Sequence, residues 1–304
     1  MTEREQAQIW REQIENSLEE MSELRERLHP IAFTSKLWEE YTGAYGDVRE
    51  DVAFLFCPKE SLPEMEKIRR LDFEEKEDAW INFDNLCENL LHQLSFYDAT
   101  YLAMPYLLLF LEKKKRENDF KWQFQIIIQT GLMLSTDIPY FNPDKKELPK
   151  NILESYELSI ELLKEIAKEF LQQNMEKLKK EDKMDLKYFC TSLMAIFGDK
   201  EKAYTLIGGN WEQVSFTCPN CDYFDGEIEI DSISDKEILE KMIVPAESVL
   251  GKWDGKSFED TYLWFCNLIH MFGIEEEWKV PYYYGIYQCP KCGYKGLAMD
   301  WMKY

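Results

Sequence analysis

Histidine is scarce in this sequence, since only His29, His92 and His270 occur among its 304 residues. We expect none of them to share a helix face, at metal-binding spacing, with another His or with a Glu, so a zinc enzyme is not indicated. The chain also lacks the G-x-S-x-G elbow, the P-loop and the G-x-G-x-x-G turn of common enzyme classes. We therefore expect no catalytic residues. Carboxylates are numerous enough to hide an acid-base pair, which leaves a hydrolase of unknown type as an alternative.

Long apolar runs are missing as well. The longest candidate, residues 106–111, is followed by Glu112 and the basic run 113–116, so it falls far short of the roughly 20 residues that cross a membrane. The first ten residues, MTEREQAQIW, are charged from the third position and have no apolar core of the kind found in signal peptides. We expect a cytoplasmic protein with no membrane partner.

Basic residues are few relative to acidic ones, because 36 Lys and Arg stand against 58 Asp and Glu, for a net charge of −22. The excess lies at both ends, with −12 over residues 1–90 and −8 over residues 218–304, against −2 between them. The negative electrostatic field that results repels phosphate backbones and attracts cationic proteins. We expect no nucleic-acid partner and favour a basic protein partner, with solubility alone as the simpler explanation of the acidity.

Apolar side chains recur at helical spacing over most of the first 200 residues, and a content of 45% hydrophobic and 14% aromatic residues indicates a folded chain. Predicted helices cover residues 1–28, 35–41, 83–95, 97–112, 120–134, 150–174 and 185–197, with 43–80 as connecting structure. Segments 101–111 and 124–134 are apolar nearly all round, which is typical of helices packed between neighbours. We predict a mainly α fold, with a HEAT-like α-helical solenoid or bundle over 1–210 and a smaller region over 211–304.

The eight cysteines fall into two groups. Four are scattered through apolar or helical segments and are predicted to be buried, reduced thiols: Cys57, Cys87, Cys190 and Cys266. The other four form two C-P-x-C knuckles separated by 67 residues: Cys218, Cys221, Cys289 and Cys292. Two thiolate pairs on tight turns supply the four sulfurs of a closed tetrahedral site, so we predict one structural Zn2+. A redox C-x-x-C pair, two disulfides and a four-thiolate iron site are the alternatives.

Strand patterns flank both knuckles. Residues 226–233 alternate as G-E-I-E-I-D-S-I, the pattern of a half-buried strand, and residues 282–288 also predict a strand. Between them, residues 257–272 predict a helix that packs on the strands or on the helical body. The C-terminal region is thus expected to be a small β zinc ribbon that carries a helical insertion.

One polar stretch interrupts the predicted helices, with the sequence H-Q-L-S-F-Y-D-A-T-Y-L-A-M-P-Y-L over residues 92–107. Its polar side chains suit an architectural role, because His92 at a helix end can donate to the last carbonyls and Asp98 or Thr100 can cap the next helix. Pro105 lies inside the next predicted helix and predicts a kink or a helix start.

This stretch resembles the H-Q-G-[ST]-x-Y-x-A-[ST]-x-A-x-P-[FH]-L motif of uncharacterised bacterial HEAT-like helical proteins. The chain departs from it at Leu94, where the family usually has Gly, and at Met104, where a small residue or Val is usual. Those relatives also carry a C-P-x-C segment after a G-G helix end, similar to residues 208–221 here. The matched positions, which we interpret as structural, are His92, Gln93, Tyr97, Thr100 and Pro105.

Some members of that family resemble immunity proteins of polymorphic or contact-dependent toxin systems, which implies a protein that binds and blocks a cognate toxin. An acidic helical surface suits a basic nuclease domain on electrostatic grounds. Carboxylates beside aromatics mark the best contact surface: Glu275, Glu276, Glu277, Trp278, Tyr282 and Tyr284. In a strand only alternate tyrosines face outward, so the others would belong to the core. A zinc-ribbon nucleic-acid or transcription-associated module, with the 113–116 run as its footprint, is the first alternative.

Overall fold

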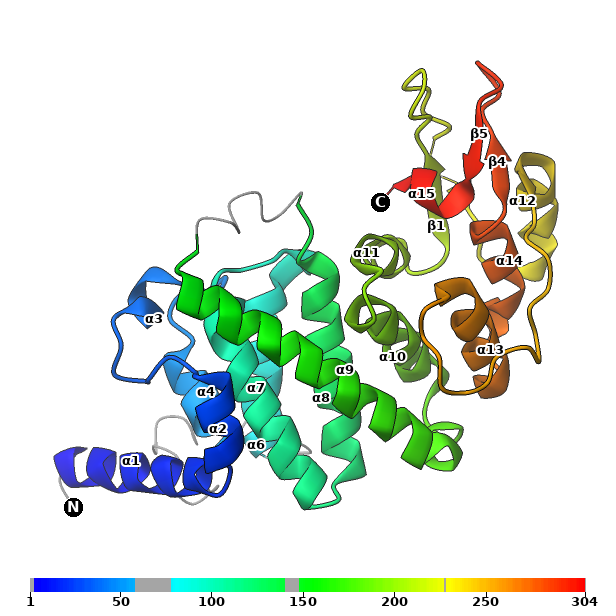
Figure 1. The fold of residues 1–304 in the computed structure, drawn as a ribbon. Coiled ribbons are helices and arrows are strands. Elements are labelled where there is room, and N and C mark those ends of the chain that lie inside the picture. Colours follow the sequence, from blue (N-terminus) through cyan, green and yellow to red (C-terminus); the bar gives the residue numbers. More distant parts are fainter. Residues whose placement is uncertain (1–2, 58–77, 140–147, 227, 304) are drawn as a thin grey trace. The chain divides into compact units, whose positions relative to one another are not determined.

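The computed structural model describes residues 3–57, 78–139, 148–226 and 228–303. Within these ranges the chain is mainly helical, as predicted, and its strands are short. It divides into two compact units, Met1–Glu165 and Ile166–Tyr304, which are treated separately (Figure 1). The domain boundary predicted after residue 210 falls inside the second unit, between its last regular helix before the strands and the first strand.

The first unit is built from helices. In chain order they are α1 (Glu3–Glu19), α2 (Ser22–Leu28), α3 (Leu37–Glu40), α4 (Arg49–Phe54), α6 (Asp78–Leu91), the 3-10 turn η2 (His92–Leu94), α7 (Ala99–Arg116), α8 (Phe120–Thr136) and the first part of α9 (Lys150–Leu178). The segment 43–80, predicted to be connecting structure, contains α4 and the start of α6, and its residues 58–77 lie outside the described residues.

Two helices, α1 and α2, replace the single long helix predicted for residues 1–28. After Glu19 the chain turns, and the N–H of Met21 donates to the Leu18 carbonyl at 3.0 Å. Arg25 of α2 reaches back across the turn to Glu15 of α1, with Nη1 2.8 Å from Oε2. Because Leu18 and Met21 are both buried, the apolar periodicity continues through the turn, and spacing alone cannot reveal it.

The centre of the first unit is the pair α7 and α8. Every residue of α7 from 99 to 111 is buried, which confirms the prediction of a helix that is apolar nearly all round. Residues 117–119 join it to α8, where Asp119 caps the helix by accepting the N–H of Trp122 at 3.2 Å. Because α7 begins before Pro105 and runs on through it, the helix start that was one of the two predicted outcomes at this proline does not occur.

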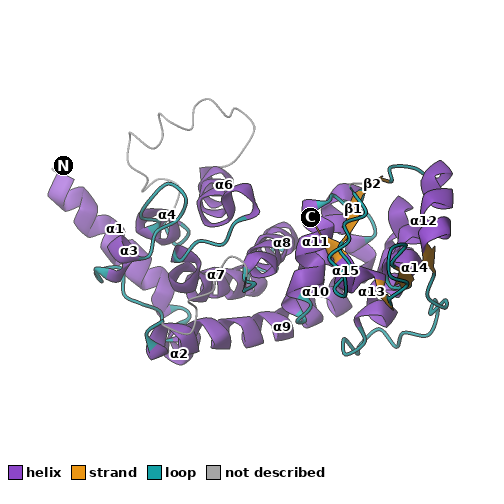
Figure 2. Ribbon diagram, turned by 90° about the horizontal axis from the view of Figure 1, so that it is seen from above, coloured by secondary structure: helices purple, strands orange, loops and turns teal. Residues whose placement is uncertain are grey.

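The second unit holds every named strand of the described chain (Figure 2). After the end of α9 its elements are α10 (Lys183–Ile196), α11 (Lys200–Gly208), β1 (Gln213–Phe216), β2 (Ile228–Glu229), η4 (Ile233–Asp235), α12 (Lys236–Met242), β3 (Ile243–Val244), α13 (Thr261–Phe272), η5 (Glu275–Lys279), α14 (Val280–Tyr283), β4 (Ile286–Gln288), β5 (Lys295–Leu297), α15 (Ala298–Trp301) and β6 (Met302–Lys303). The strands form two antiparallel sheets, ordered β2-β1-β6 and β3-β4-β5.

Both predicted strands beside the knuckles are shorter than expected. Among the described residues of 226–233, which leave out residue 227, only β2 is a strand, and of residues 282–288 only β4 is. The residues before β4 form α14, in which the N–H of Tyr284 donates to the Val280 carbonyl at 3.1 Å. Pro281 lies in the first turn of α14, where its fixed φ favours the start of a helix. An aromatic run that reads as a strand is therefore helical at its beginning.

The helix predicted within the insertion is present as α13 and begins at Thr261, because Asp260 caps it by accepting the N–H of Leu263 at 3.0 Å. It packs on the helices of the same unit, as one of the two predicted arrangements requires. Phe197, which follows α10, packs edge-on against Trp264 of α13 with ring centroids 5.9 Å apart. None of the helices in the described part of the chain has both the length and the apolar character of a membrane-spanning segment.

Candidate metal centre

The two cysteine knuckles lie at the tips of two hairpins. Strand β1 leads into Cys218, and the bridge between Thr217 and Phe224 extends the β1–β2 pairing around the first knuckle. The second knuckle, residues 289–292, is the turn between β4 and β5. Figure 1 shows both tips at the same end of the second unit. Residues far apart in the sequence are thus brought into one cluster.

The two knuckles share one backbone geometry. The N–H of Asp222 donates to the Cys218 carbonyl, and the N–H of Gly293 donates to the Cys289 carbonyl, both at 2.9 Å. In each knuckle the N–H of the first cysteine also donates, at 2.9 Å, to the carbonyl of the second residue after the last cysteine. Asp222 (φ 53°) and Gly293 (φ 73°) both adopt the left-handed conformation that closes such a turn. The sequence duplication is therefore a structural duplication.

The four cysteine sulfurs lie within 4.8 Å of one another. Cys218 Sγ is 3.6 Å from Cys292 Sγ, and Cys221 Sγ is 3.8 Å from Cys289 Sγ, and both of these contacts join one knuckle to the other. A disulfide bond measures about 2.05 Å, so these sulfurs are not bonded in pairs. A tetrahedron with bonds of about 2.3 Å to sulfur has edges of about 3.8 Å. The cluster could hold one metal ion.

The sulfurs differ in their affinity for protons. The backbone N–H of Tyr294 and the amide of Asn220 lower the pKa of Cys292 to about 6, while desolvation raises the pKa of Cys221 to about 12. Four neighbouring thiolates repel one another, and a divalent cation is the ordinary means by which proteins hold such a set ionised. The donor set is uniformly soft, which suits zinc or iron rather than magnesium or calcium.

Aromatic rings join the two hairpins beside the sulfurs. Phe216 and Tyr287 each stand two residues before the first cysteine of a knuckle, and their rings stack with centroids 4.6 Å apart. Trp301 packs edge-on against Tyr287 at 5.1 Å and face to face with Tyr294 at 5.5 Å. A Cβ on Gly296 would lie 2.4 Å from Trp301 Nε1, so only glycine fits there. The hairpins thus have an apolar contact of their own beside the sulfur cluster.

The remaining four cysteines take no part in this cluster. Cys87, Cys190 and Cys266 are buried and Cys57 is half-buried. Desolvation raises the pKa of Cys57 to about 11 and that of Cys266 to about 12, and it raises the pKa of Cys87 and Cys190 further above the ordinary thiol value. All four are free thiols, as predicted, and three of them are buried as predicted, whereas Cys57 is only half-buried.

Two of the predicted partner-contact residues belong to the core. Tyr282 and Tyr284 are only 5% and 8% exposed. The hydroxyl of Tyr282 donates to Glu240 Oε1 at 3.2 Å, and the ring of Tyr284 stacks on Tyr262 with centroids 4.9 Å apart. The expectation that alternate tyrosines face outward assumed a strand, and the helical turn of α14 removes that alternation. Neither tyrosine is available as a surface anchor.

The three glutamates of η5 have different surroundings. Glu276 forms an ion pair with Lys187 of α10 at 2.5 Å, in which the two side chains are only 19% and 6% exposed. Glu277 lies 2.8 Å from His270 Nδ1 and is 33% exposed. Glu275 is exposed, and Trp278 is partly exposed. Of the predicted contact set, only Glu275, Glu277 and Trp278 present substantial surface to solvent.

Two buried lysines of the second unit were not foreseen from the sequence. Lys279 is 1% exposed, and its Nζ donates to the Ile230 carbonyl at 2.6 Å and to the Trp211 carbonyl at 3.1 Å. Desolvation lowers the pKa of Lys279. Lys187, the partner of Glu276, is 5% exposed. Lysine is rarely buried, and no local pattern distinguishes these two from surface lysines, so only the fold reveals them.

In the motif at 92–107, His92 does not bond the helix carbonyls as expected. Its Nδ1 lies 2.6 Å from Glu88 Oε1 and 2.8 Å from the hydroxyl of Tyr45. Glu88 precedes His92 by one turn of α6, so the expectation that no histidine shares a helix face with a glutamate at this spacing is wrong. The exposed Tyr45 ring also packs against the imidazole with centroids 5.0 Å apart. The result is a small polar cluster on the first unit.

The rest of that motif is structural in a way different from the one predicted. Asp98 occupies the N-cap position of α7 without a capping bond from its side chain, and Thr100 Oγ1 is buried with no hydrogen-bond partner. Gln93 and Leu94 adopt φ values of 53° and 52°. This left-handed conformation is the one that glycine adopts freely, and glycine is what the resembled motif has at position 94. Tyr97 accepts the N–H of Thr100 through its carbonyl at 2.9 Å.

Two of the four charges of the basic run 113–116 form ion pairs within the first unit. Lys114 Nζ pairs with Glu117 Oε2 at 2.8 Å, and Arg116 Nε pairs with Glu112 Oε1 at 3.0 Å. Lys113 Nζ donates to the hydroxyl of Ser17 at 2.8 Å. Pairing of Lys114 and Arg116 lowers the positive charge that the run could offer to a nucleic acid.

Comparison with known proteins identifies no relative of this chain. A scan against protein-family models finds no match, and searches of the curated proteins and of the solved structures find none either. The resemblance to HEAT-like proteins therefore remains a hypothesis that depends on the motif at 92–107 and on the knuckles.

Proposed function

We propose that one structural zinc ion is held by four thiolates, those of Cys218, Cys221, Cys289 and Cys292. The sulfur separations of 3.6 and 3.8 Å fit the edges of a tetrahedral zinc site. Four protein ligands leave no position for water or substrate, so the ion would act on stability and not on catalysis. A four-thiolate iron site has the same ligands and is the alternative that metal analysis must separate.

The ion would join the two ends of the insertion, residues 222–288. Closing a loop of that length reduces the entropy of the unfolded chain, and it holds the β1–β2 and β4–β5 hairpins together at their tips. The arrangement we propose is a zinc ribbon with a helical insertion, preceded in the chain by a HEAT-like set of helices.

For the protein as a whole, we propose a stoichiometric inhibitor that binds a basic toxin domain and blocks it by occlusion, as an immunity protein does. The observation that carries this proposal is the distribution of charge. The insertion 222–288 alone has 15 acidic and 5 basic residues, a net charge of −10, within a chain of −22. A cationic nuclease domain would be attracted to such a surface and its active site would be covered by carboxylates.

A nucleic-acid-binding module is the less favoured function. A zinc ribbon can bind nucleic acids, but phosphate backbones would meet the same carboxylates with the opposite sign of interaction. In the basic run that would form its footprint, Lys114 and Arg116 are paired with Glu117 and Glu112.

The test is complex formation with the product of a neighbouring gene that encodes a basic toxin domain. Size-exclusion chromatography with light scattering should show a 1:1 complex, and the toxin's activity should fall to zero at one equivalent of inhibitor. The association rate should drop as salt increases, because the attraction is electrostatic. Absence of a complex with any neighbouring product, or binding without loss of toxin activity, would contradict the proposal.

A further inference from the structure

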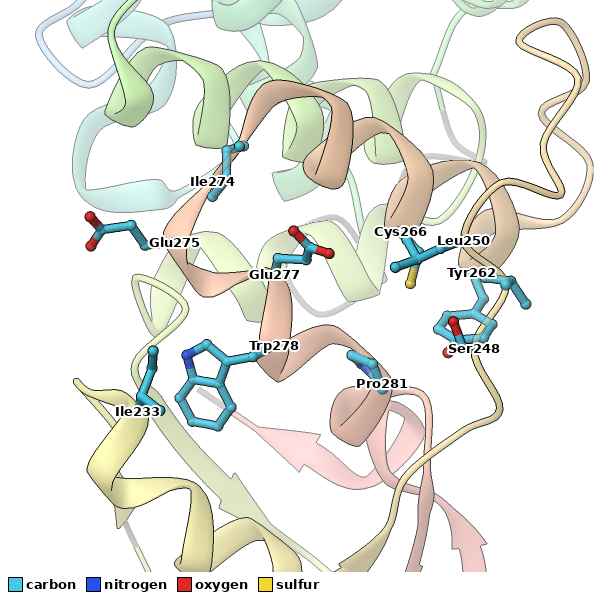
Figure 3. A pocket seen from close by; sticks show the side chains of 12 residues that line it. Ile233, Ser248, Leu250, Tyr262, Cys266, Ile274, Glu275, Glu277, Trp278 and Pro281 are labelled. Atoms are coloured by element: carbon cyan, nitrogen blue, oxygen red, sulfur yellow. The ribbon is translucent and has the colours of Figure 1, made fainter.

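A hollow on the second unit brings together the solvent-facing part of the predicted contact set. It has a volume of about 450 Å³ and is lined by segments around η4, residues 248–250, α13, η5 and α14. Figure 3 shows Ile233 and Trp278 at one end and Leu250, Tyr262 and Cys266 at the other, with Glu277 between them. All of these residues belong to the acidic insertion between the knuckles.

The walls of the hollow are apolar and accessible. Ile233 is 70% exposed and Leu250 is 41% exposed, and Trp278 is partly exposed. Apolar side chains exposed beside an aromatic ring gain free energy when a partner covers them. Tryptophan is also the residue type most enriched among interface anchors.

The charged side chains that line the hollow are all acidic. Glu275 and Glu277 line it, and none of its lining residues is Lys or Arg. Two lysines lie nearby and are engaged by backbone carbonyls: Lys279 donates to those of Trp211 and Ile230, and Lys183 donates to that of Phe272, next to the lining residue Gly273. His270 Nδ1 lies 2.8 Å from Glu277 Oε1. Glu275 is the more exposed of the two carboxylates that line the hollow.

We propose that this hollow is the docking site for a basic segment of the partner protein, in which a Lys or Arg lies over Trp278 and an apolar side chain fills the end at Leu250. The aliphatic stem of the cation would cover the indole face, and its charged head would reach Glu275 and Glu277. The inference rests on the proposed function, and it adds the place of contact and the chemistry of the segment that enters.

A peptide assay tests the hollow without the partner. The probe is a fluorescein-labelled hexapeptide of alternating lysine and leucine, with an alternating lysine and serine hexapeptide as the charge-matched control. Fluorescence anisotropy should show the leucine peptide binding at least tenfold more tightly. Glu275→Lys changes an exposed side chain and should weaken that binding at least tenfold. Glu237→Lys makes the same charge change at an exposed site outside the hollow and should weaken it no more than twofold.

Two outcomes would overturn the docking site. Equal losses for Glu275→Lys and Glu237→Lys would mean attraction by the overall charge only, and equal binding of the two peptides would mean that the apolar walls are not used. Trp278→Ala should weaken leucine-peptide binding at least tenfold, with circular dichroism as the check on its folding.

The same variants separate this inference from the proposed function. If the neighbouring gene product binds Glu275→Lys and Trp278→Ala as tightly as the unaltered protein, the docking site is wrong and the proposed function stands. If no neighbouring product binds but the leucine peptide behaves as expected, the proposed function is wrong and the hollow retains its preference for basic, apolar segments.

Discussion

Substitutions at equivalent positions of the two knuckles should change zinc affinity in opposite directions. Gly293 and Asp222 both follow the last cysteine of a knuckle, and both have positive φ values, 73° and 53°. Glycine adopts this conformation freely, whereas an L side chain is strained in it. Gly293→Ala should therefore weaken zinc binding and Asp222→Gly should strengthen it, on the premise that the knuckle relaxes when the ion leaves.

The size of the effect at Gly293 depends on backbone conformation alone, because there is room for a Cβ at this position. A Cβ at Gly293 would meet only Gln288 Nε2, at 3.8 Å, which is ordinary van der Waals contact. The left-handed conformation costs an alanine about 1 to 2 kcal/mol, and the less flexible unfolded chain offsets part of that. We expect a net loss of about 1 kcal/mol, which is about fivefold in zinc affinity. Aspartate tolerates this conformation better than alanine, so Asp222→Gly should gain only about 0.5 kcal/mol.

Competition for zinc against a chromophoric chelator measures both changes. The control is Gly255→Ala, since Gly255 has a similar φ of 76° and open space around it but lies in the insertion, away from the knuckles. It should lower the unfolding temperature and leave zinc affinity unchanged. The reasoning is refuted if Gly293→Ala binds zinc as tightly as the unaltered protein, or if Gly255→Ala weakens binding equally.

Three further substitutions, measured by differential scanning calorimetry, test other parts of the structure. Gln93→Gly should stabilise the first unit by about 0.5 kcal/mol, because the exposed Gln93 has a φ of 53°. Thr100→Val should stabilise the first unit by about 1 kcal/mol, because it removes a buried hydroxyl without a partner, and a decrease in stability would show that the hydroxyl is bonded. Glu276→Ala should destabilise the second unit by about 2 to 3 kcal/mol, because it leaves the ammonium of Lys187 buried and unpaired, and an unchanged transition would refute that role for the ion pair.

Features that depend on local patterns were predictable from the sequence. Residues 101–111 are apolar on nearly all faces of a helix, which predicted a buried helix, and α7 is buried along that whole segment. The duplicated C-P-x-C knuckles predicted one cluster, because two similar turns with two thiols each can share a single ion. The four sulfurs lie within 4.8 Å of one another.

Features that depend on distant partners were not predictable in the same way. The run at 282–284 looks like a strand by composition, but Pro281 starts a helical turn and both Tyr282 and Tyr284 are buried. The burial of Lys187 depends on Glu276, which lies 89 residues further along the chain. Periodicity contains no information about such a pairing, so the predicted contact surface included a glutamate that belongs to an internal ion pair.

Metal analysis of the purified protein tests the central claim most directly. Inductively coupled plasma mass spectrometry should find one zinc and no iron per chain. Cys218→Ser and Cys292→Ser should each lose most of that zinc and unfold at a lower temperature. Cys57→Ser is the control outside the cluster and should retain the full zinc content. A folded protein that contains no zinc after preparation without chelators, or a Cys218→Ser variant with unchanged metal content and stability, would contradict the structural zinc site.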